Sequence, residues 1–390
     1  MLVVIRAFVQ SRLLIFPQEL TDQIIEELQD DIVALKSCSL VCRSWLFSSR
    51  GHLFRKLIFT RNNAAQLSTF ITGPPRSAIP PYVRRIEFHG AEFLFGPESH
   101  FLGHFSSKVT HLHFRDIVFG SLLALLDVVC KFPVLQSLGL VNVKWAIPDP
   151  LDQKKIQRRA LPLSMVHMQL YHIPFRSFMI WLMSHAKFPT VPSLEIGPLE
   201  EPDIPYTGSY MASIGSNLQY LSFSFGFGEN GHICSYELLR KMDQEKPEPD
   251  SSSISPIAYH YWKVFGISAC DRLACFTSLR TLRIDGFLDS SAIHQSTALF
   301  WAPRLLASIR SYNIRSIILG LKLSRAGELD AYNVNWEFLD VTLMSDAYAN
   351  LRSVEFEVDG RVNIDGVAGL LEARLPKVAS RGLLRFLKPV

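Results

Sequence analysis

The chain has 390 residues, of which 48% are hydrophobic and 19% charged, with a formal net charge of +4. This composition can bury a core and excludes a wholly disordered chain, and the length fits one large domain or two ordinary ones. The small net charge gives no reason to expect nucleic-acid binding. Six cysteines and the lack of an Asn-x-Ser/Thr sequon do not suggest a secreted disulfide framework, so we expect a cytoplasmic or nuclear protein.

The first fifteen residues, MLVVIRAFVQSRLLI, are apolar but are interrupted by Arg6 and Arg12. The uninterrupted run is far shorter than the roughly 18 residues that span a bilayer, and no small-residue cleavage site follows it. We expect residues 1–15 to be an extension that packs on the next helices, with a targeting role as the alternative and no attachment to a membrane.

Residues 16–60 are predicted to form three short helices. Pro17 fits the first turn of a helix, where its missing N–H costs nothing. Leu20, Ile24 and Leu28 recur at i, i+4 and i+8, with Ile25 beside them. This spacing predicts one apolar stripe. Three short helices make a small and marginal core, and their apolar side chains exceed what such a unit can bury, which predicts a protein-docking surface.

The pair Cys38 and Cys42 has three interpretations: half of a metal site, a redox pair, or part of a packed helix. A C-x3-C pair with no second pair nearby is a poor zinc site, and a reducing compartment disfavours a disulfide. Helical spacing that continues to Trp45 places both cysteines on one face. We therefore expect both to be buried, where a free cysteine behaves as a small hydrophobe.

The residue identities of this segment resemble an F-box, through Phe16-Pro17, Glu19-Leu20, Ile24-Ile25, Cys38-x-x-Val41-Cys42-x-x-Trp45 and the closing run Arg50 to Arg55. Phe16 in place of the usual leucine is the one departure. The resemblance covers residues 16–59 and implies docking to a Skp-type adaptor and, through it, to a cullin–RING ubiquitin ligase. Some of the positions it assigns to the adaptor must instead hold the helices together. These positions are Phe16, Pro17, Leu20, Ile24, Ile25, Leu40, Val41, Cys42 and Trp45.

A motif h-x-x-h-x-h, with h apolar, recurs nine times in residues 61–390. Through the sixth copy its steps are 26 to 30 residues, near the upper end of the leucine-rich-repeat period. The alternating part predicts a strand with one buried face, and apolar stretches such as residues 120–130 and 175–183 predict helices between strands. The second apolar position of each copy is Ile86, Leu112, Leu138, Met168, Leu194, Leu221, Leu282, Ile317 or Val354.

The repeats resemble irregular, degenerate leucine-rich repeats, in which Asn142 alone lies near the asparagine position of that family. The expected fold class is α/β, with a three-helix F-box followed by an irregular strand–helix solenoid in residues 61–390. The alternative is an ordinary α/β domain with parallel strands.

The sixth and seventh copies are 61 residues apart, and residues 241–256, rich in Pro, Ser and charge, predict a flexible insertion. Residues 226–231, GFGENG, match a dinucleotide-binding motif. The preceding strand is the sixth copy of a repeat, however, and Glu229 would oppose phosphate. About twenty residues on, where a second strand should end in a ribose-binding acid, lies the polar insertion. We interpret the stretch as a turn, and we expect residues 374–390 to cap the last repeat.

The sequence lacks the G-x-S-x-G, H-E-x-x-H and P-loop motifs. His111 and His113 could coordinate a metal from one side of a strand, but no third ligand accompanies them, and solvent-facing histidines are the commoner case. Cys270 and Cys275 lack a partner pair at zinc-ribbon spacing. We expect no catalytic residue, metal or cofactor, and no enzyme.

The F-box resemblance, together with the repeats, implies the substrate-recognition subunit of a Skp–cullin–F-box ubiquitin ligase, acting by proximity alone. The alternative is an interaction scaffold that uses the same F-box and repeats without ubiquitination. The client is expected to contact exposed residues on the strand face, namely Arg85, Glu87, His111, His113, Glu195, Arg283, Asp285, Glu355 and Glu357.

Overall fold

The structure is a computed structural model that describes residues 17–73, 79–90, 99–145, 159–185, 187–199, 203–225, 275–289, 306–307, 309, 311–331 and 334–388. The predicted extension, the glycine motif and the insertion at 241–256 lie outside the described residues. The chain divides into two compact units, residues 1–117 with 131–135 and residues 118–130 with 136–390. The division into extension, F-box and repeat domain stays a prediction.

The first unit begins with three helices and continues with parallel strands. The helices α2 and α3 both pack against α4, and Ile25 and Leu35 are buried between them. The strands β1, β2 and β3 are parallel and adjacent in chain order. The elements are α2 (Gln18–Glu27), α3 (Ile32–Cys38), α4 (Arg43–Leu53), β1 (Lys56–Thr60), α5 (Ala64–Thr72), η1 (Pro80–Tyr82), β2 (Arg85–His89), η3 (Ser99–Phe105) and β3 (His111–Phe119).

The expected helical run through both cysteines is wrong, because α3 ends at Cys38 and α4 begins at Arg43. The Ser39 hydroxyl donates to the Lys36 carbonyl at the end of α3, and Cys42 has an extended backbone as the N-cap of α4. A residue that prefers caps and turns thus interrupts the helical spacing. Cys38 is buried, as expected, but Cys42 is exposed.

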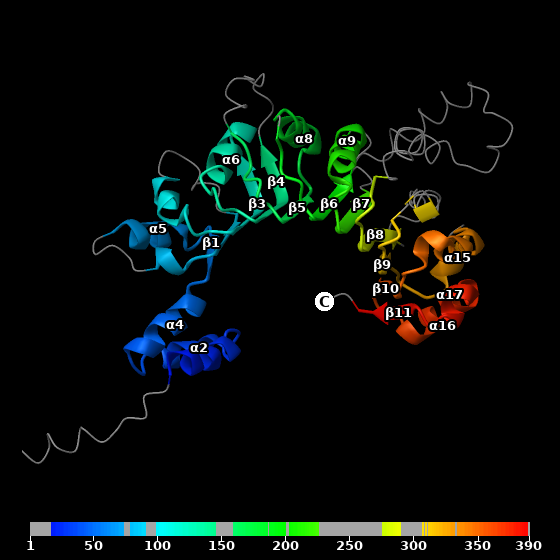
Figure 1. Cartoon of the computed structure of the whole chain (residues 1–390), viewed down its shortest axis with the longest axis horizontal. Coiled ribbons are helices and arrows are strands. Elements are labelled where there is room, and N and C mark those ends of the chain that lie inside the picture. The colour runs from blue at the N-terminus through cyan, green and yellow to red at the C-terminus, as the bar shows by residue number, and fades with distance from the viewer. Residues whose placement is uncertain are drawn as a thin grey trace, which may run out of the picture. The chain divides into compact units, whose positions relative to one another are not determined.

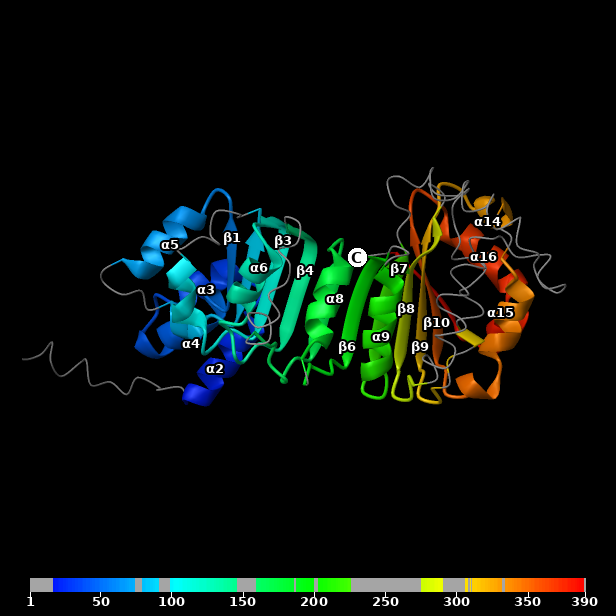
Figure 2. The same cartoon turned by 90° about the horizontal axis from the view of Figure 1, so that it is seen from above.

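The second unit alternates strands and helices along the chain. In Figure 1 the helices α6, α8 and α9 lie on one side of the strands β4 to β7, and Figure 2 shows them in front of those strands. The elements are α6 (Leu122–Val129), β4 (Ser137–Trp145), β5 (His167–Tyr171), α8 (Phe175–Met183), β6 (Ser193–Leu199), α9 (Ile204–Ile214), β7 (Tyr220–Phe225), β8 (Thr281–Asp289), β9 (Ser316–Lys322), α14 (Glu328–Ala331), α15 (Trp336–Leu343), η7 (Asp346–Tyr348), β10 (Ser353–Asp359), α16 (Ile364–Arg374), α17 (Pro376–Ser380) and β11 (Leu384–Leu387).

All nine motif copies form strands, and their second apolar positions are buried. In the second unit these positions pair across neighbouring parallel strands from Leu138 through Val354, and β11 continues the register at Leu384. Each apolar side chain therefore contacts its counterparts in the adjacent repeats, which is how a strand–helix array builds one continuous core. The predicted cap contains both a short helix, α17, and the additional strand β11.

A left-handed backbone residue recurs four positions after the motif marker. Gly90, Asp116, Asn142, His172 and Gly286 all have φ between 51° and 63°. Glycine, aspartate and asparagine are the residues that tolerate this conformation best. The position of Asn142 is thus shared by five copies, although only one of them carries asparagine.

Candidate interaction surfaces

The three N-terminal helices expose an unusual share of apolar surface. Of eighteen large apolar side chains that are exposed among the described residues, seven come from residues 17–54. We call these seven the helical apolar surface. Its members, with their exposed fractions, are Leu20 (45%), Ile24 (42%), Ile32 (59%), Val33 (74%), Leu40 (86%), Val41 (62%) and Phe47 (61%). Apolar surface concentrated in this way marks a site of protein interaction.

The helices present this surface because their other faces pack together. In α2 the side chains of Thr21 and Ile25 turn inward, and Asp22 accepts hydrogen bonds from Gln18 at 2.7 Å and from Ser48 of α4. The α2–α4 contact thus uses the inward face of α2, and Leu20 and Ile24 remain outside it.

The described residues among those expected to face an adaptor separate into three groups, exposed, half-buried and buried. Pro17, Leu20, Ile24, Leu40, Val41 and Cys42 are exposed, Trp45 is half-buried, and Phe16 lies outside the described residues. Ile25 is fully buried, so it holds the helices together. The predicted single stripe on α2 is therefore split between its core and its surface.

Cys42 has a polar environment. Its Sγ lies 3.0 Å from the Ser44 hydroxyl, and this hydrogen bond, helped by the backbone N–H of Trp45, lowers the pKa of the Cys42 thiol. Cys42 is therefore a solvent-facing thiol with raised thiolate character. It is not the small buried hydrophobe that the sequence suggested.

A second candidate surface lies on the strands of the first unit. The register places nine side chains in three rows of three on one face of the sheet, which we call the β1–β3 polar face. From β1 to β3 the rows are Lys56, Arg85, His111; Ile58, Glu87, His113; and Thr60, His89, Arg115. On the opposite face Phe59, Phe88 and Phe114 stack, with ring centroids 5.1 and 5.2 Å apart.

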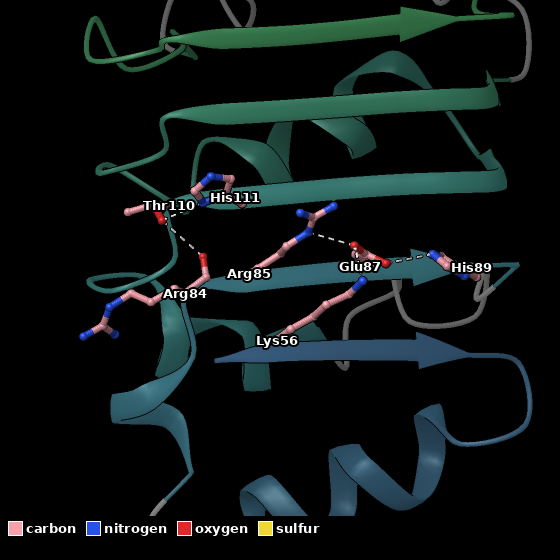
Figure 3. A network of polar contacts seen from close by, with 7 residues as sticks. All are labelled: Lys56, Arg84, Arg85, Glu87, His89, Thr110 and His111. Carbon is pink, nitrogen blue, oxygen red and sulfur yellow. Dashed lines mark hydrogen bonds and ion pairs between the residues drawn. The ribbon is translucent and has the colours of Figure 1, made fainter. Parts of the chain in front are cut away.

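Glu87 is the centre of this face. Its carboxylate accepts from Lys56 Nζ at 2.9 Å and Arg85 Nε at 2.8 Å, and lies 3.3 Å from His89 Nε2 (Figure 3). Burial alone would raise the pKa of Glu87, but the hydrogen bond from Lys56 and the charge of Arg85 outweigh it and lower the pKa. Glu87 is therefore an ionised carboxylate that fixes the positions of its cationic neighbours.

The histidines of the same face differ from one another. Burial lowers the pKa of His113 to about 4, so its ring is neutral at physiological pH, and its Nε2 atom is buried without a hydrogen-bond partner among the described residues. The His111 ring is exposed, and its Nδ1 lies 2.8 Å from the Thr110 hydroxyl, which donates to the Arg84 carbonyl at 3.3 Å (Figure 3).

The strand face of the second unit carries polar and charged side chains that bond to one another. Arg283 pairs with Asp285 at 2.6 Å and with Glu357 at 2.7 Å. Glu195 accepts from Gln169 at 3.0 Å, and Ser353 donates to Glu355 at 2.6 Å. The network thus connects β5 with β6 and β8 with β10.

The expected exposure of the nine client-binding residues is mostly wrong. Only Arg85 and His111 are exposed, Glu87 is 5% exposed, and the other six are half-buried. Adjacent strands lie only about 4.8 Å apart, so neighbouring polar side chains cover and bond one another. Their role in binding a client stays a prediction.

Sequence reasoning missed three basic side chains of the β1–β3 polar face, Lys56, His89 and Arg115. His89 and Arg115 continue the alternation of Glu87 and His113 by one step, so extending the strand pattern would have found them. Lys56 belongs to β1, which was assigned to the end of the helical segment.

Among the described residues, no group of three or more His, Cys, Asp and Glu side chains could hold a metal ion. The described helices are all too short or too polar to cross a membrane.

No family model matches the chain, and no curated protein matches it. Among solved structures, it is similar to the leucine-rich repeat-containing protein LegL7 from Legionella pneumophila, with 11% identity and a TM-score of 0.38, over 82% of this chain and 98% of that one.

Proposed function

We propose that the chain is the substrate-recognition subunit of a Skp–cullin–F-box ubiquitin ligase. Residues 16–60 act as the F-box and bind a Skp-type adaptor, and the strand–helix units act as irregular leucine-rich repeats that bind a client protein. The chain contributes no catalytic group and acts by holding the client near a ubiquitin-charged enzyme.

The observation that carries this proposal is the helical apolar surface. Leu20 and Ile24 project from one helix, and Leu40 and Val41 from the turn between the next two, at 42% to 86% exposure. A docking partner that covers these side chains would remove them from water, at about 25 cal/mol per Å² of apolar area. The F-box resemblance supplies the identity of the proposed partner.

The experiment is affinity purification from cells under proteasome inhibition, with the wild type compared with Leu20→Asp/Ile24→Asp. The matched control, Phe338→Asp/Val341→Asp, introduces the same charges at two exposed apolar positions of α15, which are 40% and 49% exposed. Wild type and control should both recover an adaptor and a cullin, and the α2 variant should recover neither.

Two outcomes would redirect the proposal. Recovery of an adaptor without a cullin would favour the alternative, a scaffold that uses the same surfaces without ubiquitination. Two carboxylates buried in such an interface would strongly weaken it. An adaptor complex that survives in Leu20→Asp/Ile24→Asp would therefore show that the helical apolar surface is not the adaptor-binding site.

A further inference from the structure

The β1–β3 polar face has a composition that identifies a kind of ligand. We propose that this face binds an acidic segment of a partner protein through Lys56, Arg85 and Arg115. The identification of that partner as the ubiquitination client rests on the proposed function, whereas the binding of an acidic segment does not.

The charge that faces solvent is positive. Lys56, Arg85 and Arg115 carry three positive charges against the single carboxylate of Glu87. The side chains of Lys56 and Arg85 are 46% and 47% exposed, whereas that of Glu87 is 6% exposed. An approaching ligand therefore meets the cations first, and the surface complements negative charge.

The cations also retain unused hydrogen-bond donors. Glu87 occupies Nε of Arg85, and the terminal nitrogens of Arg85 extend away from Glu87 in Figure 3. A guanidinium has five N–H donors and an ammonium three, so Arg85 and Lys56 can each bind a second carboxylate or a phosphate. Arg115 is exposed and forms no ion pair within the described part of the chain.

The geometry favours an extended segment. Lys56 and Arg85 are partners on neighbouring strands, about 4.8 Å apart, whereas Arg115 pairs with His89, four residues or about 13 Å further along the strand direction from Arg85. An extended peptide that runs along the strands repeats its same-side side chains every ~6.6 Å, so two such steps connect the Lys56–Arg85 pair with Arg115. The stacked phenylalanines beneath the face and the Glu87 contacts hold the cations in place before binding, which lowers the ordering cost.

The test is fluorescence anisotropy with labelled probes and the full chain. The probes are (Glu-Gly)4, (phosphoserine-Gly)4, (Lys-Gly)4 and a single-stranded oligodeoxythymidine of matched charge. Lys56→Gln/Arg115→Gln removes two charges without placing a new carboxylate beside Glu87. The control, Arg352→Gln/Arg361→Gln, removes two charges from exposed arginines of the second unit.

We expect both acidic peptides to bind, and the Lys56/Arg115 variant to bind them about tenfold more weakly than wild type and control do. The tighter of the two peptides identifies the anion as carboxylate or phosphate. The inference is overturned if neither acidic peptide binds, if the variant binds as well as the wild type, or if the oligonucleotide binds more tightly than both peptides.

Adaptor binding by the same proteins separates this inference from the proposed function. The Lys56/Arg115 variant should bind a Skp-type adaptor like the wild type. If the acidic peptides fail while the adaptor binds, only this inference is wrong. If the peptides bind while the adaptor does not, the proposed function is wrong and the polar face remains a site for acidic segments.

Discussion

The exchange Glu87→Gln should destabilise the first unit by a predictable amount. It removes the charge from two contacts of 2.8 and 2.9 Å and from the 3.3 Å contact with His89. The two cations are almost half exposed and regain water when released, so each contact is worth about 0.2–1 kcal/mol after screening. The amide can still accept one hydrogen bond, and we expect a total loss of about 0.4–2 kcal/mol in the free energy of unfolding.

The pH dependence of that loss follows from the lowered pKa of Glu87. The folded protein holds this carboxyl below its ordinary pKa of 4.5, so its stabilisation is present above the unfolded pKa and disappears as pH falls through the folded one. Urea unfolding, with amide hydrogen exchange of β2 as the local measure, should show the full difference at pH 7 and a smaller one only below about 4.5. An unchanged midpoint at pH 7 would refute the reasoning.

Three further changes test the packing and the thiol. Asp340 is 2% exposed and accepts hydrogen bonds from two backbone N–H groups of α17. Asp340→Ala should therefore lower the free energy of unfolding, measured in urea, by about 2–4 kcal/mol, and Asp340→Asn should lower it less. Gly360→Ala should lower the free energy of unfolding by more than about 2 kcal/mol, because φ of Gly360 is +116° and an added Cβ would meet the carbonyl oxygen of Leu323. Gly369→Ala, where an added Cβ would meet nothing, should raise the free energy of unfolding by about 0.5–1 kcal/mol. An alkylating reagent should modify the exposed Cys42 before the buried Cys38, and a bound adaptor should block the modification of Cys42. Mass spectrometry of the peptides that contain each cysteine measures both effects.

The repeat strands were predictable because apolar residues alternate with other residues along each of them. In each copy the apolar positions are buried and align with those of the neighbouring strands, from Leu138 to Val354. Local pattern and long-range packing agree there, as they must in a repeat array. The helices α6 and α8 were predictable from their predominantly apolar sequences, and five side chains of each are buried in the structure.

The remaining features depend on contacts that a pattern does not reveal. The helical spacing through Cys38 and Cys42 is real, but a Ser39 side chain that bonds the backbone ends the helix between them. The burial of Glu87 follows from cations on two strands, one of them unrecognised. Which residues of α2 face outward was decided by α4, and the sequence alone left Ile24 and Ile25 equivalent.

The most direct test of the central claim is calorimetric titration of the purified chain with a purified Skp-type adaptor. The account predicts that the wild type and Phe338→Asp/Val341→Asp bind alike, with the negative heat-capacity change that marks apolar burial. Leu20→Asp/Ile24→Asp should retain the wild-type unfolding midpoint within about 0.5 kcal/mol, because both side chains are 42% to 45% exposed, and should show no binding. A wild type that does not bind, or an α2 variant that binds equally well, would contradict the account.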